Sequence, residues 1–284
     1  MADTMLTFRN DGLVSFMSKD EMHQKAPYIF SKERTNPKVS GRYVFASTET
    51  IIDDLAKLGW GVVDCKQQRA TKRGAGIRSF HMVAFQNPNI FITEEGEGSS
   101  RVECYPRIIL TNSHDGFNSF KFMVGMFRLV CSNGLVIATE KFADISIRHI
   151  NYTFEELRGV VAKAIEAVTA HVSIMNQMQE TILTEEQKAE LATSALRIRT
   201  NNEDLKVSED DIEDILTPTR QEDEGDSLWN VFNVLQEKII KGNYNMVSPT
   251  NGKTRKARAI KGVARDIEIN QNLFRTALTY AQAA

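Results

Sequence analysis

The spacing of apolar residues changes abruptly near Thr153, and this change limits what the 284-residue chain can fold into. Between residues 60 and 150, β-branched and aromatic residues form short runs divided by turn signals, a pattern typical of β-strands. From Phe154 to Ile182, apolar residues recur every three or four positions, which predicts a long amphipathic helix. We therefore expect an α+β protein, in which an antiparallel sheet packs against a long helix and a helical C-terminal region follows.

The expected sheet is an antiparallel meander, because the connections between its strands are short and rich in turn residues such as Asn133-Gly134. A short helix precedes it, with Thr48 as the expected N-cap and Gly59 at the C-terminal end. The predicted strands are Trp60 to Gln67, Arg78 to Gln86, Cys104 to Leu110, Phe120 to Val130, Leu135 to Thr139 and Ile145 to His149.

Four segments are expected along the chain. Residues 1–47 form an N-terminal arm without sustained periodicity, and residues 48–183 form the α+β core. Residues 184–226 hold a helix and an acidic linker, and residues 227–284 form a helical region with a basic segment. The linker carries eleven carboxylates between Glu203 and Asp226, which is typical either of a solvated linker or of an interaction surface.

Two blocks of cations interrupt a nearly neutral chain and point to nucleic acid as a partner. Each phosphate that a cation neutralises releases counterions, which strengthens binding without reading sequence. Tyr105, Phe117 and Tyr244 could add base stacking, and the alternative is that both blocks are ordinary solvated surface. The candidate nucleic-acid-binding residues are Lys66, Arg69, Lys72, Arg73 and Arg78 in the first block and Lys253, Arg255, Lys256, Arg258, Lys261 and Arg265 in the second.

The polar run from Asn112 to Gly116 contains serine, histidine and aspartate, which suggests a hydrolase. Neighbouring side chains on a strand point to opposite faces, however, and no G-x-S-x-G motif is present. We favour a turn in which Asp115-Gly116 reverses the chain while Asn112 and His114 bond to nearby backbone. No catalytic residue is assigned, and the chain is expected not to be an enzyme.

Neither a metal nor a cofactor is expected. His81, His114 and His149 could gather around a metal with Asp115 or Asp144, but no HxH or HExxH spacing supports this. No GxxxxGK[ST] or GxGxxG phosphate loop occurs, and the three cysteines form no CxxC pair. With neither a signal peptide nor a long apolar stretch, the chain is expected to be cytoplasmic and not to bind membranes.

Several motifs resemble the phage/plasmid-like domain-of-unknown-function family numbered 932. The most specific are Leu110 to Gly116 (LTNSHDG) and Phe127 to Leu135 (FRLVCSNGL), supported by Ser40 to Tyr43, Gly59-Trp60, His81-Met82, Arg148-His149 and Trp229 to Glu237. This resemblance implies a gene of phages, plasmids or integrated elements and brings no established reaction. The order of a helix, several strands and a long helix is also loosely similar to the core of Rad52-type annealing proteins.

The leading hypothesis is a non-enzymatic nucleic-acid-binding protein of a mobile element that forms homo-oligomers. It would bind single-stranded DNA through the two cationic blocks and promote strand annealing. The alternative is an interaction protein that binds and inhibits a host factor, such as a defence enzyme, with the acidic segment imitating nucleic acid.

Overall fold

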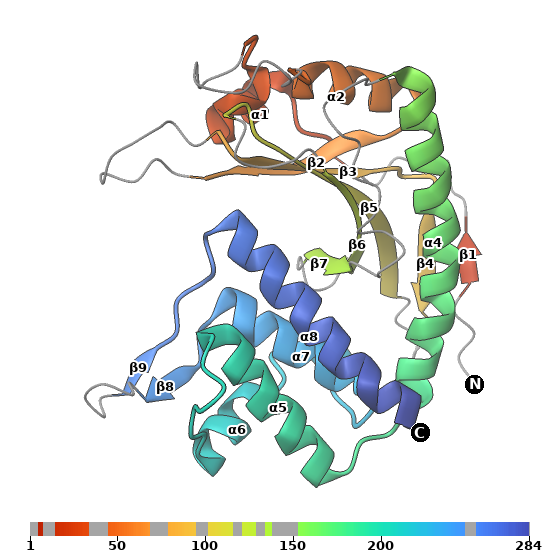
Figure 1. Cartoon of the computed structure of the whole chain (residues 1–284). Coiled ribbons are helices and arrows are strands. Elements are labelled where there is room, and N and C mark those ends of the chain that lie inside the picture. The colour runs from red at the N-terminus through yellow and green to blue at the C-terminus, as the bar shows by residue number, and fades with distance from the viewer. Residues whose placement is uncertain are drawn as a thin grey trace. The chain divides into compact units, whose positions relative to one another are not determined.

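The computed structural model describes residues 5–7, 15–33, 45–68, 79–94, 102–115, 121–128, 134–137, 153–247 and 254–283 (Figure 1). Contacts between residues divide the chain into two compact units. The sheet unit lies within residues 4–170, and the helical unit runs from residue 171 to the C-terminus.

In its described residues the sheet unit contains seven strands, and all neighbouring strands are antiparallel. The long β5 lies at its centre: its C-terminal half pairs with β3, its N-terminal end pairs with β4, and β6 pairs along its other edge. The strands are β1 (Met5–Thr7), β2 (Gly61–Gln67), β3 (His81–Gln86), β4 (Phe91–Glu94), β5 (Val102–Asn112), β6 (Lys121–Arg128) and β7 (Gly134–Ile137).

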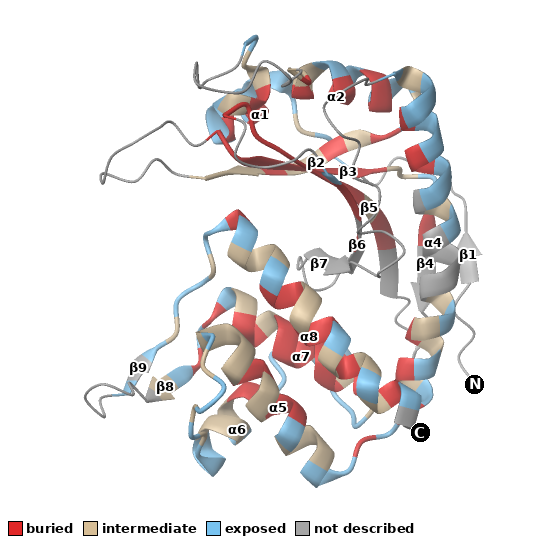
Figure 2. Cartoon of the chain, in the orientation of Figure 1, coloured by how far each residue is buried: buried red, intermediate tan, exposed pale blue. Residues whose placement is uncertain are grey.

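All six residues of β3 are buried, so neither face of this strand meets water (Figure 2). Two helices, α1 (Lys19–Lys25) and α2 (Thr48–Lys57), lie beside β2, with the short 3₁₀ helix η1 (Pro27–Phe30) between them in sequence (Figure 1). The inner side of α2 buries Ile51 and Leu55 completely, as expected of apolar residues four positions apart on one helix face.

The predicted meander is confirmed for β2, β3, β5, β6 and β7, which follow one another in the sheet in chain order. The sequence did not reveal β4, which lies between β3 and β5 along the chain and, among the described residues, pairs with three residues of β5. The sixth predicted strand, residues 145–149, lies outside the described residues.

The predicted N-cap of α2 was wrong by one residue. Ser47 is the cap, because its hydroxyl accepts a hydrogen bond from the backbone amide of Thr50. Thr48 instead begins the helix and points into the protein, with no exposed surface. At the other end, Gly59 has a φ of +83°, so the predicted helix end is confirmed.

The long helix α4 (Phe154–Glu180) begins in the sheet unit and ends in the helical unit, and its early residues Leu157 and Val160 are buried. The α+β fold class predicted from the sequence is therefore confirmed. The other elements of the helical unit are α5 (Glu185–Thr200), α6 (Glu209–Leu216), the 3₁₀ helix η3 (Gln221–Asp223), α7 (Leu228–Lys241), the hairpin of β8 (Asn245–Val247) and β9 (Thr254–Lys256), and α8 (Val263–Ala283).

The core of the helical unit lies where α7 meets α5, α6 and α8. Phe232 of α7 packs edge-on against Phe274 of α8, with ring centroids 5.9 Å apart. The acidic segment joins this core through Ile215 of α6, which is completely buried. Each helix in the described part of the chain is either too short or too polar to span a lipid bilayer.

Candidate functional site

The structure describes little of the first cationic block. Lys66 lies near the end of β2 and is half-buried. Arg69, Lys72, Arg73 and Arg78 lie outside the described residues, and their predicted role stays a prediction.

Three cations of the second block are exposed and have no ionic partner in the described part of the chain: Lys256, Arg258 and Lys261. Within the described ranges, no carboxylate oxygen lies within 4.0 Å of their side-chain nitrogens. Of the other predicted members, Arg255 lies on β9 and Lys253 is not described.

Arg265 has a different role from its neighbours in the block. Its guanidinium donates hydrogen bonds to the carbonyl oxygens of Ile198 and Arg199 and forms an ion pair with Glu268 at 2.8 Å. The last carbonyls of a helix have no partner within that helix, and a cation is favourable there. Arg265 therefore stabilises the C-terminal end of α5.

The backbone that carries the exposed cations is fixed against the ends of α5 and α7. Ala257 exchanges hydrogen bonds with the residues after α7, accepting from the amide of Asn243 and donating to the carbonyl of Tyr244. The amide of Ile260 donates to the carbonyl of Ile240, 2.8 Å away. The segment is thus attached to α7 on both sides of Arg258.

Arg199 joins this surface from α5, because its guanidinium donates a hydrogen bond to the carbonyl of Arg258. We call the four cations Arg199, Lys256, Arg258 and Lys261 the basic edge. Sequence reasoning missed Arg199, since it stands alone on a helix far from the cationic block.

The predicted base stacking was wrong for Tyr105 and Tyr244, which are 3% and 1% exposed and cannot reach a base in this fold. Phe117 is outside the described residues.

The described residues of the polar run at the end of β5, Asn112 to Asp115, are buried and bond to distant parts of the chain. Asn112 donates from Nδ2 to the carbonyl of Ala46 at 3.1 Å and to the hydroxyl of Thr48 at 2.9 Å. Asn112 therefore bonds to backbone, as expected, but to backbone that is far away in the sequence and not within the turn. The two partners precede it by more than sixty residues, and they connect β5 to the start of α2.

His81 continues this network on β3. Nδ1 lies 2.7 Å from the carbonyl oxygen of Ser79, which can only accept, so Nδ1 carries the proton. Nε2 then accepts from the hydroxyl of Thr48 at 2.8 Å. Burial lowers the pKa of His81 to about 4, which keeps the ring neutral. Both ring nitrogens are occupied, and no cluster in the described part of the chain could hold a metal ion.

The rest of the run ties β5 to the start of β3. Asp115 accepts from the amide of Ser79 at 3.0 Å, and the Ser79 hydroxyl accepts from the amide of His114 at 2.6 Å. The His114 ring packs between Phe45 and His81, with centroids 4.8 and 5.0 Å away. These contacts give the run a structural role, while Gly116 of the predicted turn is not described.

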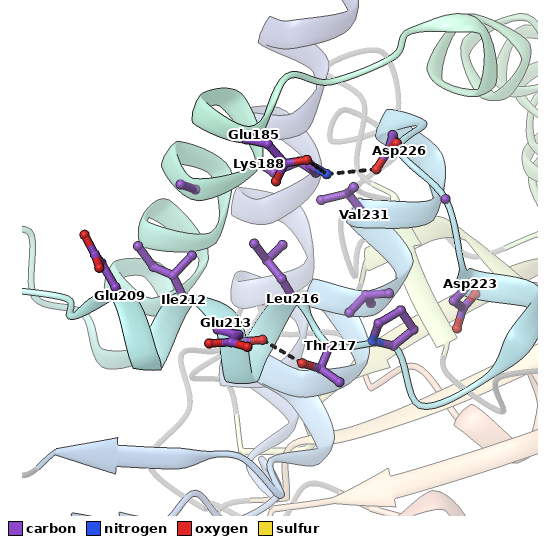
Figure 3. A pocket seen from close by; sticks show the side chains of 14 residues that line it. Glu185, Lys188, Glu209, Ile212, Glu213, Leu216, Thr217, Asp223, Asp226 and Val231 are labelled. Atoms are coloured by element: carbon purple, nitrogen blue, oxygen red, sulfur yellow. Dashed lines mark hydrogen bonds and ion pairs between the residues drawn. The ribbon is translucent and has the colours of Figure 1, made fainter.

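A cavity of about 570 Å³ opens in the helical unit between α5, α6, the loop before α7, and α7 itself (Figure 3). Its apolar lining residues are Ala189, Ile212, Leu216, Pro218, Val231 and Val234. Its carboxylates are Glu185, Glu209, Glu213, Asp223 and Asp226, and its remaining lining residues are Lys188, Thr217 and Gly225. Sequence reasoning noticed the acidic segment but could not reveal that it folds around a cavity.

Comparison with known proteins places the chain in a family. A model of the domain of unknown function DUF932 matches residues 37–276. The chain is also similar to two Escherichia coli (strain K12) proteins, UPF0380 protein YafZ at 28% identity and UPF0380 protein YfjQ at 29% identity. Each match extends over 265 residues, which is 91% of this chain and 89% of the relative. No solved structure matches the chain significantly. The chain therefore belongs to the DUF932 family, as its sequence motifs indicated.

Proposed function

We propose that this chain is a nucleic-acid-binding protein of a phage or other mobile element, without enzymatic chemistry of its own, that binds single-stranded DNA along the basic edge. The observation that carries the proposal is a set of three exposed cations, Lys256, Arg258 and Lys261. They have no ionic partner among the described residues, and hydrogen bonds fix their backbone to the end of α7. Cations that have no carboxylate partner remain available for phosphates, and fixing their backbone lowers the entropy lost on binding.

Arg199 strengthens the case because it comes from another helix. A run of cations in one loop can be ordinary solvated surface, but here α5 contributes a guanidinium that is bonded to the backbone of Arg258. Successive phosphates of a strand would therefore meet cations from two elements. Assembly into a homo-oligomer would multiply such contacts along one strand, and strand annealing is the activity that we propose for the assembly.

The proposal is tested by titrating a fluorescent single strand of about 30 nucleotides, longer than the site of one simple binding module, at several salt concentrations. The test variant replaces Lys256 and Arg258 by alanine. The control replaces Lys163 of α4 and Arg275 of α8, an exposed lysine and arginine, which gives the same charge change. Arg275 is suitable as a control because it lies about 18 Å, at 1.5 Å per residue, from the first residue of α8, which follows the basic edge in the chain.

We expect the test variant to bind more weakly and its salt dependence to flatten by about 1.4, at about 0.7 for each lost contact. The control should bind like the unmodified chain. The proposal fails if the chain does not bind at low salt, or if the two variants lose affinity equally, because binding would then follow net charge instead of the basic edge.

A further inference from the structure

The charges around the cavity of the helical unit are not balanced. The Lys188 ammonium bonds to Glu185 at 2.5 Å and to Asp226 at 2.8 Å. The hydrogen bond to Asp226 raises the pKa of Lys188 most, and the hydrogen bond to Glu185 raises it further. Asp223, which is 1% exposed, pairs with Arg220 at 3.0 Å. The other two carboxylates, Glu209 and Glu213, are both exposed.

Within the described part of the chain, Glu209 and Glu213 have no cation within 4.0 Å. Both lie on α6, four residues apart and therefore on one side of the helix, with Ile212 and Leu216 beside them in the lining (Figure 3). The cavity thus presents two uncompensated carboxylates at its rim and apolar side chains within.

The loop that forms the far wall is held in place before any ligand arrives. Arg220 forms ion pairs with Asp223 and with Glu237 of α7, and the Asn230 side chain donates to the carbonyl of Glu224 at 2.6 Å. At the end of the loop, the carbonyl of Asp226 accepts from the amide of Leu183 at 2.9 Å. A pocket fixed in this way loses little conformational entropy when a ligand binds.

An exposed apolar residue pairs with the chain next to the cavity lining. Ile182 is 65% exposed and pairs with Ser227 in an isolated antiparallel bridge, one residue from the lining residue Asp226. Single exposed apolar residues are common, but the backbone of this one pairs with the residue that follows the lining residue Asp226. A ligand that covers both features must carry positive charge and apolar surface together.

We propose that this cavity is a docking site for a basic, amphipathic segment of a partner protein. A lysine or arginine of that segment would lay its apolar stem on Ile212 and Leu216 and bring its cation to Glu209 and Glu213. An apolar neighbour in the segment would cover Ile182. The site is independent of the nucleic-acid proposal, because its carboxylates repel phosphates.

The probe is a short fluorescent peptide that alternates arginine and leucine, titrated into the full chain and followed by anisotropy. The test variant carries Glu209→Gln and Glu213→Gln. The control carries Glu203→Gln and Asp204→Asn, which remove the same charge from the same acidic segment outside the cavity lining. We expect about tenfold weaker binding in the test variant, as for the loss of one charge-assisted contact, and no change in the control.

A second variant, Ile182→Ser, tests the apolar contact without touching a charge. It should weaken binding of the peptide but not of a matched peptide with glycine in place of leucine. Equal losses in the Glu209/Glu213 variant and its control would overturn the site, because only general attraction would remain. A different result would be that the chain self-associates and that the Glu209/Glu213 variant abolishes this self-association. This result would overturn the proposal of a partner protein, because the cavity would then bind a second copy of the chain. The Glu209/Glu213 variant should bind single-stranded DNA no more weakly than the unmodified chain. The docking proposal and the nucleic-acid proposal can therefore fail separately.

Discussion

The hydroxyl of Thr48, the first residue of α2, lies 2.8 Å from Nε2 of His81 on β3. Because the same hydroxyl accepts from the Asn112 amide, it links a helix to two neighbouring strands through one oxygen atom. This bond is available only while His81 is neutral, since a protonated imidazole has no acceptor to offer. The stability of the sheet unit should therefore depend on pH.

The first prediction concerns acid sensitivity. Burial lowers the pKa of His81 to about 4 in the folded chain, against 6.5 for an exposed histidine. Between these values the unfolded chain binds more protons, so the free energy of unfolding should fall as pH drops from about 6.5 to about 4. The loss from this residue is about 3 kcal/mol. Above pH 6.5 its contribution should be fully present.

Urea unfolding at a series of pH values checks this prediction. His81→Asn should be less stable than the unmodified chain at pH 7 but should lose less stability on acidification. The control, His23→Asn, alters an exposed histidine and should follow the unmodified chain. Parallel pH profiles for the unmodified chain and His81→Asn would show that His81 is not the group responsible.

The second prediction concerns Arg220, which holds the loop of the helical unit. Its partners Asp223 and Glu237 are largely buried, at 1% and 14% side-chain exposure. Burial acts to raise the pKa of Glu237, but hydrogen bonds from Thr219, Arg220 and Lys241 outweigh it and lower the pKa. Arg220→Ala removes the cation that these two carboxylates share, although Glu237 keeps its ion pair with Lys241. Removing one partner of a buried ion pair should cost about 3 kcal/mol or more.

The free energy of unfolding, measured by chemical denaturation, is compared for Arg220→Ala and Arg158→Ala. The difference between the two losses isolates the effect of burial on the ion pairs. Arg158 pairs with Glu155 at 3.2 Å on the surface of α4, and an exposed pair of this kind contributes less than about 1 kcal/mol. Similar losses in both variants would mean that the Arg220 pairs are as weak as surface pairs.

The third prediction compares two glycines. Gly242, which ends α7, has a φ of +77°, and a Cβ there would lie 2.6 Å from the carbonyl oxygen of Ala257. Gly242→Ala should therefore destabilise the helical unit and displace the segment that carries Arg258, costing more than about 1 kcal/mol. Gly159 lies inside α4, and a Cβ there would meet nothing within 4 Å, so Gly159→Ala should stabilise the chain by about 0.5–1 kcal/mol.

Thermal unfolding should show opposite shifts in melting temperature for the two glycine variants. In the DNA titration, Gly242→Ala should also weaken binding, because it moves the backbone of the basic edge, whereas Gly159→Ala should not. A higher melting temperature for Gly242→Ala would contradict this prediction. It would show that the Ala257 carbonyl leaves room for a side chain at residue 242.

The sequence alone determined the features that depend on neighbouring residues. The change in the spacing of apolar residues near Thr153 predicted the start of α4, because the apolar residues on one side of a helix recur every three or four positions. The helix expected from residue 184 onwards is α5, which begins with a capping box between Thr184 and Gln187, a signal that lies within four neighbouring residues. The motifs around Asn112 and Arg128 also identified the family correctly.

Only the tertiary structure decided which distant residues meet. β4 is four residues long and has no periodicity of its own, so its pairing with β5 could not be predicted. The bond from Asn112 to Thr48 and the contact of Arg199 with Arg258 likewise join segments far apart in the sequence. Such contacts depend on how the elements pack, since a side chain can bond to any group that folding brings within about 3 Å. The cavity beside Glu209 and Glu213 exists for the same reason: α6 folds back onto α7, which the acidic composition of the segment could not indicate.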